Sequence, residues 1–288
     1  MIGILSNIND QIFLKQLDLP FTLLNKYDPA NLIDGLFIDW IPKVPVYRDA
    51  WMKQASLLQE YIKMGIPIVI FDRGFSLTEK EVNWVKKFNV YLFEPALNSD
   101  RKGFNYLPEW IHNFEVRIDD EDREYDLAYS SHNIEYYVKE FEKWFKDYAR
   151  LFPNKKVSFS SFEISDFKLE EYKNNNLINL QYNQSIFDSA AFTAAIDTKK
   201  SYEIGYFNPV NFLAMNRGCL PLLPFKHKYF HGMFNGLIMK DLKEMDYYVS
   251  LYGRVKDIII QEIFDRIKTD WPEFTVDYAA SVIRSCYE

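Results

Sequence analysis

Short, uniformly apolar runs alternate with segments of helical periodicity over the first hundred residues. Apolar runs without polar alternation are typical of strands buried on both faces of a parallel sheet. The segment 46–64 carries apolar residues at steps of four, three and four, which form one face of a helix, and Gly65 with Pro67 ends it. The pattern therefore predicts strands at 2–6, 21–24, 35–40, 66–71 and 90–93.

A second helix is predicted at 78–87, because Thr78 and Glu81 have the spacing of a capping box. Alternation of strand, helix and strand is the pattern of a parallel sheet whose strands are joined by crossover helices. The first part of the chain is therefore expected to be an α/β unit with a parallel sheet and crossover helices.

The same alternation resumes after the acidic stretch 117–126, which we interpret as a connection. Further strands are predicted at 125–130, 157–162, 177–180 and 193–196, and helices close the chain at 242–252, 255–268 and 275–286. Two α/β units of similar size are the simplest interpretation, and one large doubly wound sheet is the alternative. A long helix is predicted from one apolar face, formed by Ile134, Val138, Phe141, Phe145 and Tyr148.

Composition allows a large core, since hydrophobic residues make up 48% of the 288 residues and aromatic residues 17%. No apolar run approaches the roughly 20 residues of a membrane span, and the first residues lack the basic and apolar regions of a signal peptide. Two cysteines, Cys219 and Cys286, make no disulfide framework, and no His/Cys spacing indicates zinc. We expect a cytoplasmic protein without a membrane partner, in the host cytoplasm if a phage encodes it.

The net charge of −7 is concentrated in one segment, because 119–126 holds six acidic residues against Arg123 alone. A globally acidic protein repels polyanions, whereas an acidic linker beside nearly neutral domains need not. The charge therefore argues only weakly against a nucleic-acid partner.

The segment 201–224 has the pattern of a loop, a short helix, a tight turn and a strand. Asn208 is a good N-cap, Pro209 suits the first helical turn, and Gly218 can end the helix in the left-handed conformation. A helix N-terminus with unpaired N–H groups attracts a diphosphate. Many α/β proteins, however, contain a capped helix before a strand and bind nothing there.

This segment resembles the donor-binding motif of GT-B glycosyltransferases: an aromatic-led loop, a helix with Phe212, Ala214 and Met215, then the run 217–221. It is most similar to the spore-protein-like, CgeB-type branch. Segments 66–72 and 105–108 also resemble parts of that branch, and the compact size is similar to small phage DNA glucosyltransferases.

The resemblance implies two Rossmann-like domains that face a central cleft. Residues 1–116, joined by the C-terminal helix 272–288, would hold the acceptor, and residues 117–271 would hold the donor. It also implies a nucleoside diphosphate sugar as donor, with UDP-glucose our choice, and neither a permanently bound cofactor nor a metal. Oligomeric state is not indicated by the sequence.

Donor contacts are expected at the carboxyl ends of strands in the second domain and in the 201–224 motif. The family usually has a glutamate, which bonds the donor ribose, where this sequence has Leu213. Glu203 and Asn211 are the nearest polar replacements. The full set of expected donor contacts is Ser130, Ser131, His132, Tyr182, Asn183, Glu203, Phe207, Asn208 and Asn211.

Catalytic groups are expected after strands of the first domain, where Asp39 and Asp72 could act as general base and Arg73 could neutralise the leaving diphosphate. The competing interpretation is that an aspartate caps the following loop and the arginine lies on the surface. The pair Asp120 and Asp122 matches a metal-binding spacing but lies within a charge run, which favours a solvated linker. A small cationic loop is expected at Lys226, His227, Lys228 and His231.

As acceptor we favour hydroxymethylated or already glucosylated cytosine in double-stranded phage DNA, because the chain is compact and its Asn-, Lys-, Tyr- and Phe-rich composition suits an AT-rich genome. A polysaccharide or protein-glycan acceptor is the alternative, as is a GT-B-like binding protein without catalysis, which Leu213 would favour. Basic residues that could contact DNA are Lys43, Arg48, Lys53, Arg73, Arg101 and Lys102.

Overall fold

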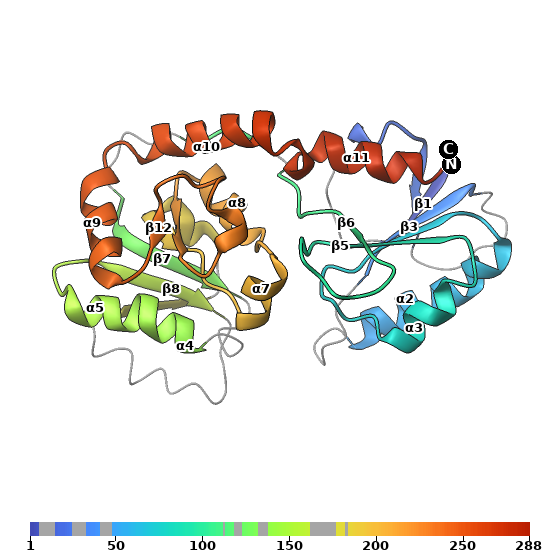
Figure 1. The fold of residues 1–288 in the computed structure, drawn as a ribbon, viewed down its shortest axis with the longest axis horizontal. Coiled ribbons are helices and arrows are strands. Elements are labelled where there is room, and N and C mark those ends of the chain that lie inside the picture. The colour runs from blue at the N-terminus through green and yellow to red at the C-terminus, as the bar shows by residue number, and fades with distance from the viewer. Residues whose placement is uncertain are drawn as a thin grey trace. The chain divides into compact units, whose positions relative to one another are not determined.

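The structure is a computed structural model that describes residues 1–5, 15–24, 33–40, 48–111, 113–117, 123–131, 138–161, 177–181 and 184–288. The chain forms two compact units, which are described separately (Figure 1). Unit 1 comprises 1–112 and 272–288, and unit 2 comprises 113–271. The first boundary thus falls at 112/113, where the sequence analysis expected 116/117.

Unit 1 is built on a sheet of six parallel strands in the order β2-β1-β3-β4-β5-β6. The chain reverses its direction of strand addition between β1 and β3, as in flavodoxin-like folds. The strands are β1 (Ile2–Leu5), β2 (Phe21–Leu23), β3 (Gly35–Asp39), β4 (Ile68–Phe71), β5 (Val90–Glu94) and β6 (Asn105–Tyr106).

Helices cover both faces of this sheet, which explains why its central strands are buried throughout. One face packs against α2 (Arg48–Tyr61), which ends in a 3₁₀ turn (Ile62–Met64), and against α3 (Glu79–Val85). The other face packs against α11 (Val276–Ser285), which follows the 3₁₀ turn Pro272–Phe274 and brings the end of the chain back to unit 1 (Figure 1).

Unit 2 contains a second sheet of six parallel strands, in the order β12-β11-β10-β7-β8-β9. Counted within the unit, this is the 3-2-1-4-5-6 order of dinucleotide-binding Rossmann folds. Its strands are β7 (Tyr125–Ser131), β8 (Val157–Ser161), β9 (Leu177–Gln181), β10 (Ala190–Ala194), β11 (Leu220–Pro224) and β12 (Ile238–Met239).

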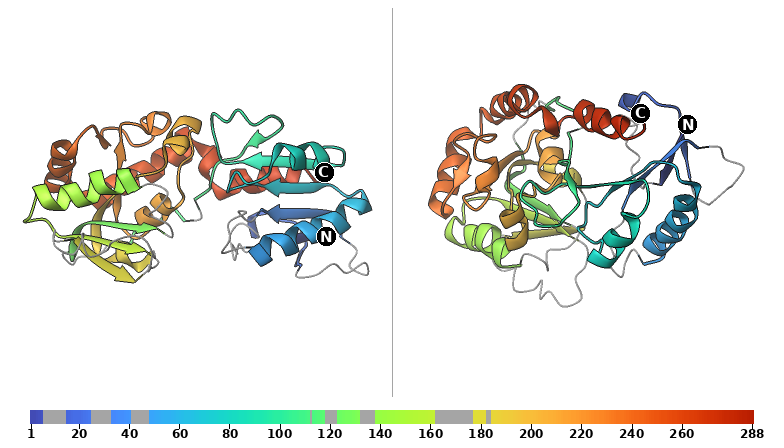
Figure 2. Two further views of the ribbon diagram at one scale, coloured as in Figure 1. Left: turned by 90° about the horizontal axis from the view of Figure 1, so that it is seen from below. Right: turned by 45° about the vertical axis from the view of Figure 1, so that its right-hand side comes forward.

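An aromatic cluster anchors a helical segment of unit 2 to its sheet. Figure 2 shows this segment as the light green helix beside the strands. The rings of Tyr129, Phe141, Phe145 and Phe159 have centroids 5.0 to 6.0 Å apart. This segment consists of α4 (Val138–Phe141), a π-helical turn (Glu142–Lys146) and α5 (Asp147–Leu151). The other helices are 3₁₀ turns Gln184–Asp188 and Lys228–Phe230, α7 (Lys199–Ile204), α8 (Val210–Asn216), α9 (Leu242–Tyr252) and α10 (Lys256–Asp270).

The predicted fold class, two Rossmann-like α/β units, is confirmed, and the alternative of one large sheet is wrong. Some element boundaries differ from the predicted ones for local chemical reasons. Strand β4 begins at Ile68, not at residue 66, because Pro67 has no N–H to donate to the ladder. The capping box of Thr78 and Glu81 is present as predicted.

Among the described residues, the sequence analysis missed one α-helix. Residues 199–204 form α7, where the sequence analysis expected a loop. The Thr198 hydroxyl caps this helix by accepting the Ser201 N–H at 3.1 Å, and Gly205 ends it at φ 67°. The sequence did contain a signal for this helix: Thr198 can cap its start, and Gly205, after six helical residues, can end it.

Candidate functional site

Ligands of doubly wound sheets bind beyond the carboxyl ends of the strands, at the point where the strand order reverses. In unit 1 this point lies between β1 and β3, and in unit 2 it lies between β7 and β10. The residues that follow these strands are therefore the ones to search for a functional site.

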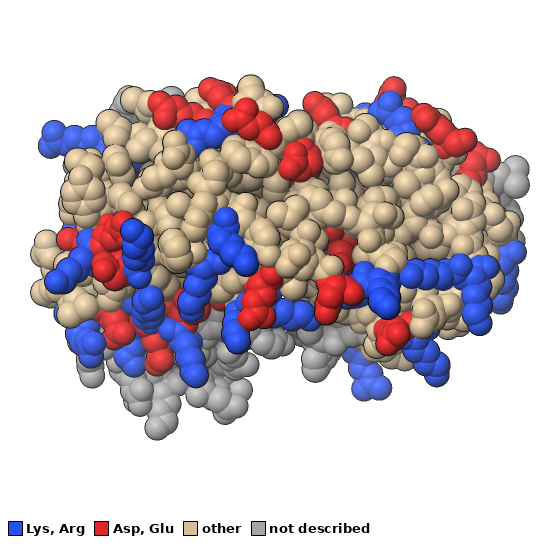
Figure 3. All heavy atoms as spheres, viewed as in Figure 1, with Lys and Arg blue, Asp and Glu red and all other residues tan. Residues whose placement is uncertain are grey.

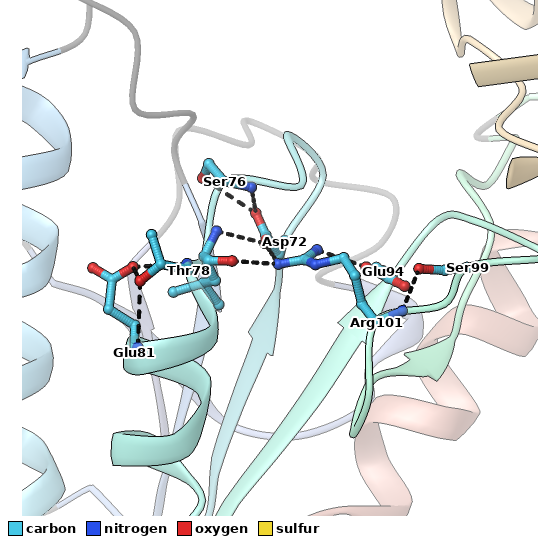
Figure 4. Close-up of polar contacts among 8 residues, drawn as sticks. Asp72, Ser76, Thr78, Glu81, Glu94, Ser99 and Arg101 are labelled. Carbon is cyan, nitrogen blue, oxygen red and sulfur yellow. Dashed lines mark hydrogen bonds and ion pairs between the residues drawn. The ribbon is translucent and has the colours of Figure 1, made fainter. Parts of the chain in front are cut away.

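Asp72, expected to be a catalytic base, is instead part of the unit 1 core (Figure 4). Its side chain has no exposed surface. One carboxylate oxygen accepts the N–H and hydroxyl of Ser76, at 3.0 and 3.3 Å, and the other accepts Leu77 N–H at 2.9 Å and Arg101 Nη2 at 2.8 Å. With four donors already bound and no solvent contact, Asp72 is not available to remove a proton from an acceptor. The loop-capping interpretation is the one that the structure supports.

Arg101 joins Asp72 to a second buried carboxylate (Figure 4). Its Nη1 donates to Glu94 at 2.6 Å, and its guanidinium lies 4.0 Å from the centroid of the Phe104 ring. Burial raises the pKa of Glu94, while hydrogen bonds from Ser99 and Arg101 lower it. The three charged groups thus fix the loops after β4 and β5, and Arg101 is committed to the fold.

Asp39 and Arg73 are brought together as an ion pair at the ends of β3 and β4. Arg73 Nε donates to Asp39 at 2.9 Å, and Nη1 donates to Glu109, a buried carboxylate that the sequence analysis missed. The Arg73 guanidinium also lies 4.8 Å from the ring centroids of Phe71 and Trp110. Because two carboxylates share this arginine, the trio has a net charge of about −1, which does not suit Arg73 to neutralise a diphosphate.

The N-cap position of α8 is Pro209 and not the predicted Asn208, although the Asn208 side chain does bond the start of the helix. The N–H groups at this helix start are already used. Asn208 Oδ1 accepts Val210 N–H at 3.1 Å, Asn208 O accepts both the N–H and the Nδ2 of Asn211, and Pro209 O accepts Phe212 N–H. The expectation that this helix offers unpaired N–H groups to a diphosphate is therefore wrong. The hydrogen bonds that Asn208 accepts at the helix start occupy the N–H groups that a diphosphate would need.

Phe207 lies in the core of unit 2 and is not placed to contact a ligand. It is 2% exposed, and its ring lies 5.0, 4.9 and 5.4 Å from the rings of Phe212, Phe230 and Phe234. The expected donor contact at Phe207 is therefore replaced by a packing role.

Replacing Phe207 by alanine is expected to destabilise unit 2 by about 3–5 kcal/mol, because it leaves a cavity among these rings. The matched control is Phe225→Ala, since Phe225 is 58% exposed and its loss should cost no more than about 0.5 kcal/mol. Urea denaturation of both variants measures the difference. Equal midpoints for the two variants would contradict the packing role.

The expected cationic loop at 226–231 contains a neutral histidine. His227 is 1% exposed and its Nε2 donates to Ala195 O at 2.8 Å, which leaves Nδ1 without a hydrogen-bond partner among the described residues. Burial lowers the pKa of His227 to about 3, so the ring carries no charge near neutrality. Lys226 forms an ion pair with Glu140 of α4. Glu203, on α7, is exposed and pairs with Lys199 at 3.6 Å.

Ser130 lies at the end of β7, next to the reversal point of unit 2. It is 1% exposed, and its hydroxyl has no hydrogen-bond partner among the described residues. Ser131 is the last residue of β7. The other expected contacts nearby, His132, Tyr182 and Asn183, lie outside the described residues.

Asp197 was missed by the sequence analysis, although it follows β10 on the other side of the reversal point. It is 5% exposed, and its Oδ1 accepts Thr198 N–H at 2.7 Å. Its Oδ2 has no partner in the part of the chain that the structure describes. Burial raises the pKa of Asp197 to about 6, although the nearby Ser201 hydroxyl and the Thr198 N–H favour the ionised carboxylate and lower it. Nothing in the sequence indicated this role, because an aspartate between a strand and a capping threonine is also typical of an ordinary turn.

Two further classes of site were searched among the described residues. No group of three or more His, Cys, Asp or Glu side chains there could hold a metal ion. No helix within the same ranges is long and apolar enough to cross a membrane.

Comparison with solved structures finds the same two-unit fold in glycosyltransferases. A mutant of the O-GlcNAc transferase of Thermobaculum terrenum is 10% identical with a TM-score of 0.56, and the match covers 99% of this chain and 67% of that chain. TarM is 10% identical with a TM-score of 0.52, over 88% of this chain and 54% of TarM. A mutant of S. aureus TarM in complex with fondaparinux, alpha-GlcNAc-glycerol and UDP is 9% identical with a TM-score of 0.52, over 88% and 55%.

The chain thus spans about half the length of TarM. No family model matches the sequence, and no curated protein matches it. At these identities the likeness establishes the fold alone, which consists of two Rossmann-like α/β units as in GT-B glycosyltransferases.

Proposed function

We propose that this chain is a glycosyltransferase that moves a sugar from a nucleoside diphosphate sugar to a hydroxyl acceptor. Unit 2 would bind the donor and unit 1 the acceptor. The observation that carries the proposal is the nucleotide-binding strand order of unit 2. Two buried polar atoms beside its reversal point, the Ser130 hydroxyl and Oδ2 of Asp197, have no hydrogen-bond partner among the described residues. The fold that the chain shares with an O-GlcNAc transferase and with a UDP-bound TarM supports it. We take UDP-glucose as the first donor to test.

Asp39 is the residue that we propose as general base. It lies at the end of β3, beside the reversal point of unit 1, and its side chain is 13% exposed, in contrast to the enclosed Asp72. Arg73 holds Asp39 through its Nε and is itself held by Glu109. We therefore propose that Arg73 orients Asp39, and that the developing diphosphate charge is stabilised by unit 2.

The acceptor favoured from the sequence, modified cytosine in phage DNA, has less support from the charges of unit 1. Of the basic residues expected to contact DNA, Arg73 and Arg101 are each paired with two carboxylates. Lys43 lies outside the described residues. On the face shown in Figure 3, acidic and basic side chains are interspersed, whereas a phosphate backbone requires a basic stripe. We keep modified DNA as one acceptor of the test, beside polysaccharide and glycan acceptors.

The proposed function is tested by UDP release from UDP-glucose with hydroxymethylated duplex DNA, unmodified duplex, oligosaccharides and glycopeptides. The wild-type chain should release UDP with one acceptor class, and Asp39→Asn should lower kcat by about 10²-fold or more, because a general base is lost. Asp49→Asn, an exposed carboxylate in the first turn of α2, is the matched control and should keep the wild-type rate. A wild-type rate in Asp39→Asn would overturn the role of Asp39.

A second candidate function is nucleotide-sugar binding without transfer. It is favoured by Leu213, which stands on α8 where the family motif has a glutamate, and by the commitment of Arg73 and Asp72 to ion pairs within unit 1. Titration with UDP separates the two functions. Tight UDP binding without UDP release from any donor and acceptor would favour the binding protein, and turnover would exclude it.

A further inference from the structure

Two neighbouring strands of unit 2 end in buried polar groups that the described residues leave unsatisfied. They are the hydroxyl of Ser130 on β7 and Oδ2 of Asp197 after β10. The β7–β10 register pairs Leu127 with Phe192, so its continuation places Ser130 level with Ala195, two residues before Asp197. Leaving a buried carboxylate oxygen unpaired costs more than leaving a neutral group unpaired. Such a cost is tolerated where a ligand supplies the missing partner.

The chemistry of these two groups selects the kind of ligand. A carboxylate oxygen is an acceptor, so it needs a donor, and a phosphate oxygen would repel it. A serine hydroxyl both donates and accepts. Adjacent hydroxyl groups on a sugar ring supply donors to the carboxylate and can both donate to and accept from the serine. The other polar side chains expected nearby are already used, because Asn211 bonds the turn before α8 and Glu203 pairs with Lys199 on the surface.

We infer that Asp197, assisted by Ser130, binds adjacent hydroxyl groups of a sugar ring in the donor. This inference rests on the proposed function and assigns a binding role to a residue outside the family motif. The ring is either the ribose of the nucleotide or the sugar to be transferred, and both present the same chemistry. Tyr202 fixes the backbone at this point, because its hydroxyl accepts Asp197 N–H at 2.8 Å.

The substitution Asp197→Asn tests the inference with little disturbance of the fold. An asparagine Oδ1 can still accept Thr198 N–H, so the contact at the start of α7 is retained. The variant also removes a buried charge, so the unliganded Asp197→Asn protein should melt at a higher temperature than the wild type at pH 7.5. Asp265→Asn is the matched control, since that side chain is 64% exposed on α10.

The measurement is calorimetric titration of the full chain with UDP, 2′-deoxy-UDP and UDP-glucose. Asp197→Asn should weaken the affected ligand by about tenfold or more, because a hydrogen bond to a charged group is lost, and Asp265→Asn should match the wild type. If the ribose is bound, the wild type prefers UDP to 2′-deoxy-UDP and Asp197→Asn loses that preference. If the transferred sugar is bound, the variant instead loses the preference for UDP-glucose over UDP.

Unchanged affinities for all three ligands in Asp197→Asn would overturn the inference and leave the proposed function standing. A lower melting temperature together with weaker binding would also overturn it, because Asp197 would then be structural. A wild-type chain that binds none of the three ligands would overturn the proposed function itself. Ser130→Ala should weaken the same ligand as Asp197→Asn, and a loss confined to a different ligand would contradict their shared role.

Discussion

Asp72→Asn is expected to destabilise unit 1 by about 3–5 kcal/mol, because it removes one partner of a buried ion pair. In one orientation the asparagine NH₂ group would face Leu77 N–H and Arg101, and in the flipped orientation it would face Ser76 N–H. Because these groups are all donors, either orientation leaves hydrogen bonds unmade. Arg101 would keep only Glu94 as a charged partner. Urea denaturation at pH 7.5, followed by tryptophan fluorescence, measures the change.

The matched control for Asp72 is Asp34→Asn, whose carboxylate is 83% exposed and pairs with the amino terminus. Exposed ion pairs contribute about 1 kcal/mol or less, so the control should stay close to the wild type. A fully stable Asp72→Asn protein that no longer releases UDP would contradict the structural role and restore Asp72 as the catalytic base.

Acidification is expected to destabilise unit 2 through His227. The pKa of this side chain is lowered to about 3 in the fold, from 6.5, because burial disfavours the charged ring. The unfolded chain therefore binds a proton that the folded chain does not, and stability is lost as pH falls below 6.5. The loss is about 2 kcal/mol at pH 5 and approaches about 5 kcal/mol at pH 3. His227→Gln, which can still donate to Ala195 O, should remove this loss, and substitution of the partly exposed His231 by glutamine should not.

The pH dependence of stability that Asp197 contributes has the opposite sign to that of His227, so the two can be measured against each other. Its pKa is raised to about 6 from 3.8, so the folded chain binds the proton more tightly and loses stability as pH rises toward 6. Asp197→Asn should therefore be more stable than the wild type by roughly 3 kcal/mol above pH 7, and the gain should vanish near pH 4. Urea denaturation at pH 4, 5, 6 and 8 measures both effects. A gain that persists at pH 4 would contradict burial of the charge.

The fold could be predicted from the sequence because its central strands, such as β1, β4 and β11, are short apolar runs that are buried throughout. The edge strands β2 and β6 are largely exposed and carry a weaker signal. The helices with a strong apolar face or a capping box, such as 78–87 and 242–252, were also recognisable. The missed helix α7 is short and begins with two lysines, so only its cap and its glycine marked it. The match to GT-B proteins in three dimensions supports the same fold.

The candidate site was less predictable, because sequence shows which side chains follow a strand but not which hydrogen bonds they make. Asp39 is the last residue of β3 and Asp72 directly follows β4. One carboxylate is partly exposed, whereas the other accepts hydrogen bonds from four donors. Asn208 and Asn211 satisfy the helix start that they were expected to leave open. Burial, which decides the chemistry of Asp197 and His227, depends on contacts between distant segments.

The return of α11 to unit 1 has a consequence for the order in which the protein can fold during synthesis. Val276, Ala279, Ala280 and Ile283 are part of the core on one face of the unit 1 sheet, so this core stays incomplete until residues 276–283 leave the ribosome. Unit 2 is encoded by one uninterrupted stretch and can close first. A nascent chain halted before residue 276 should therefore hold a protease-resistant unit 2 and a protease-sensitive unit 1, although most of unit 1 precedes unit 2 in the chain.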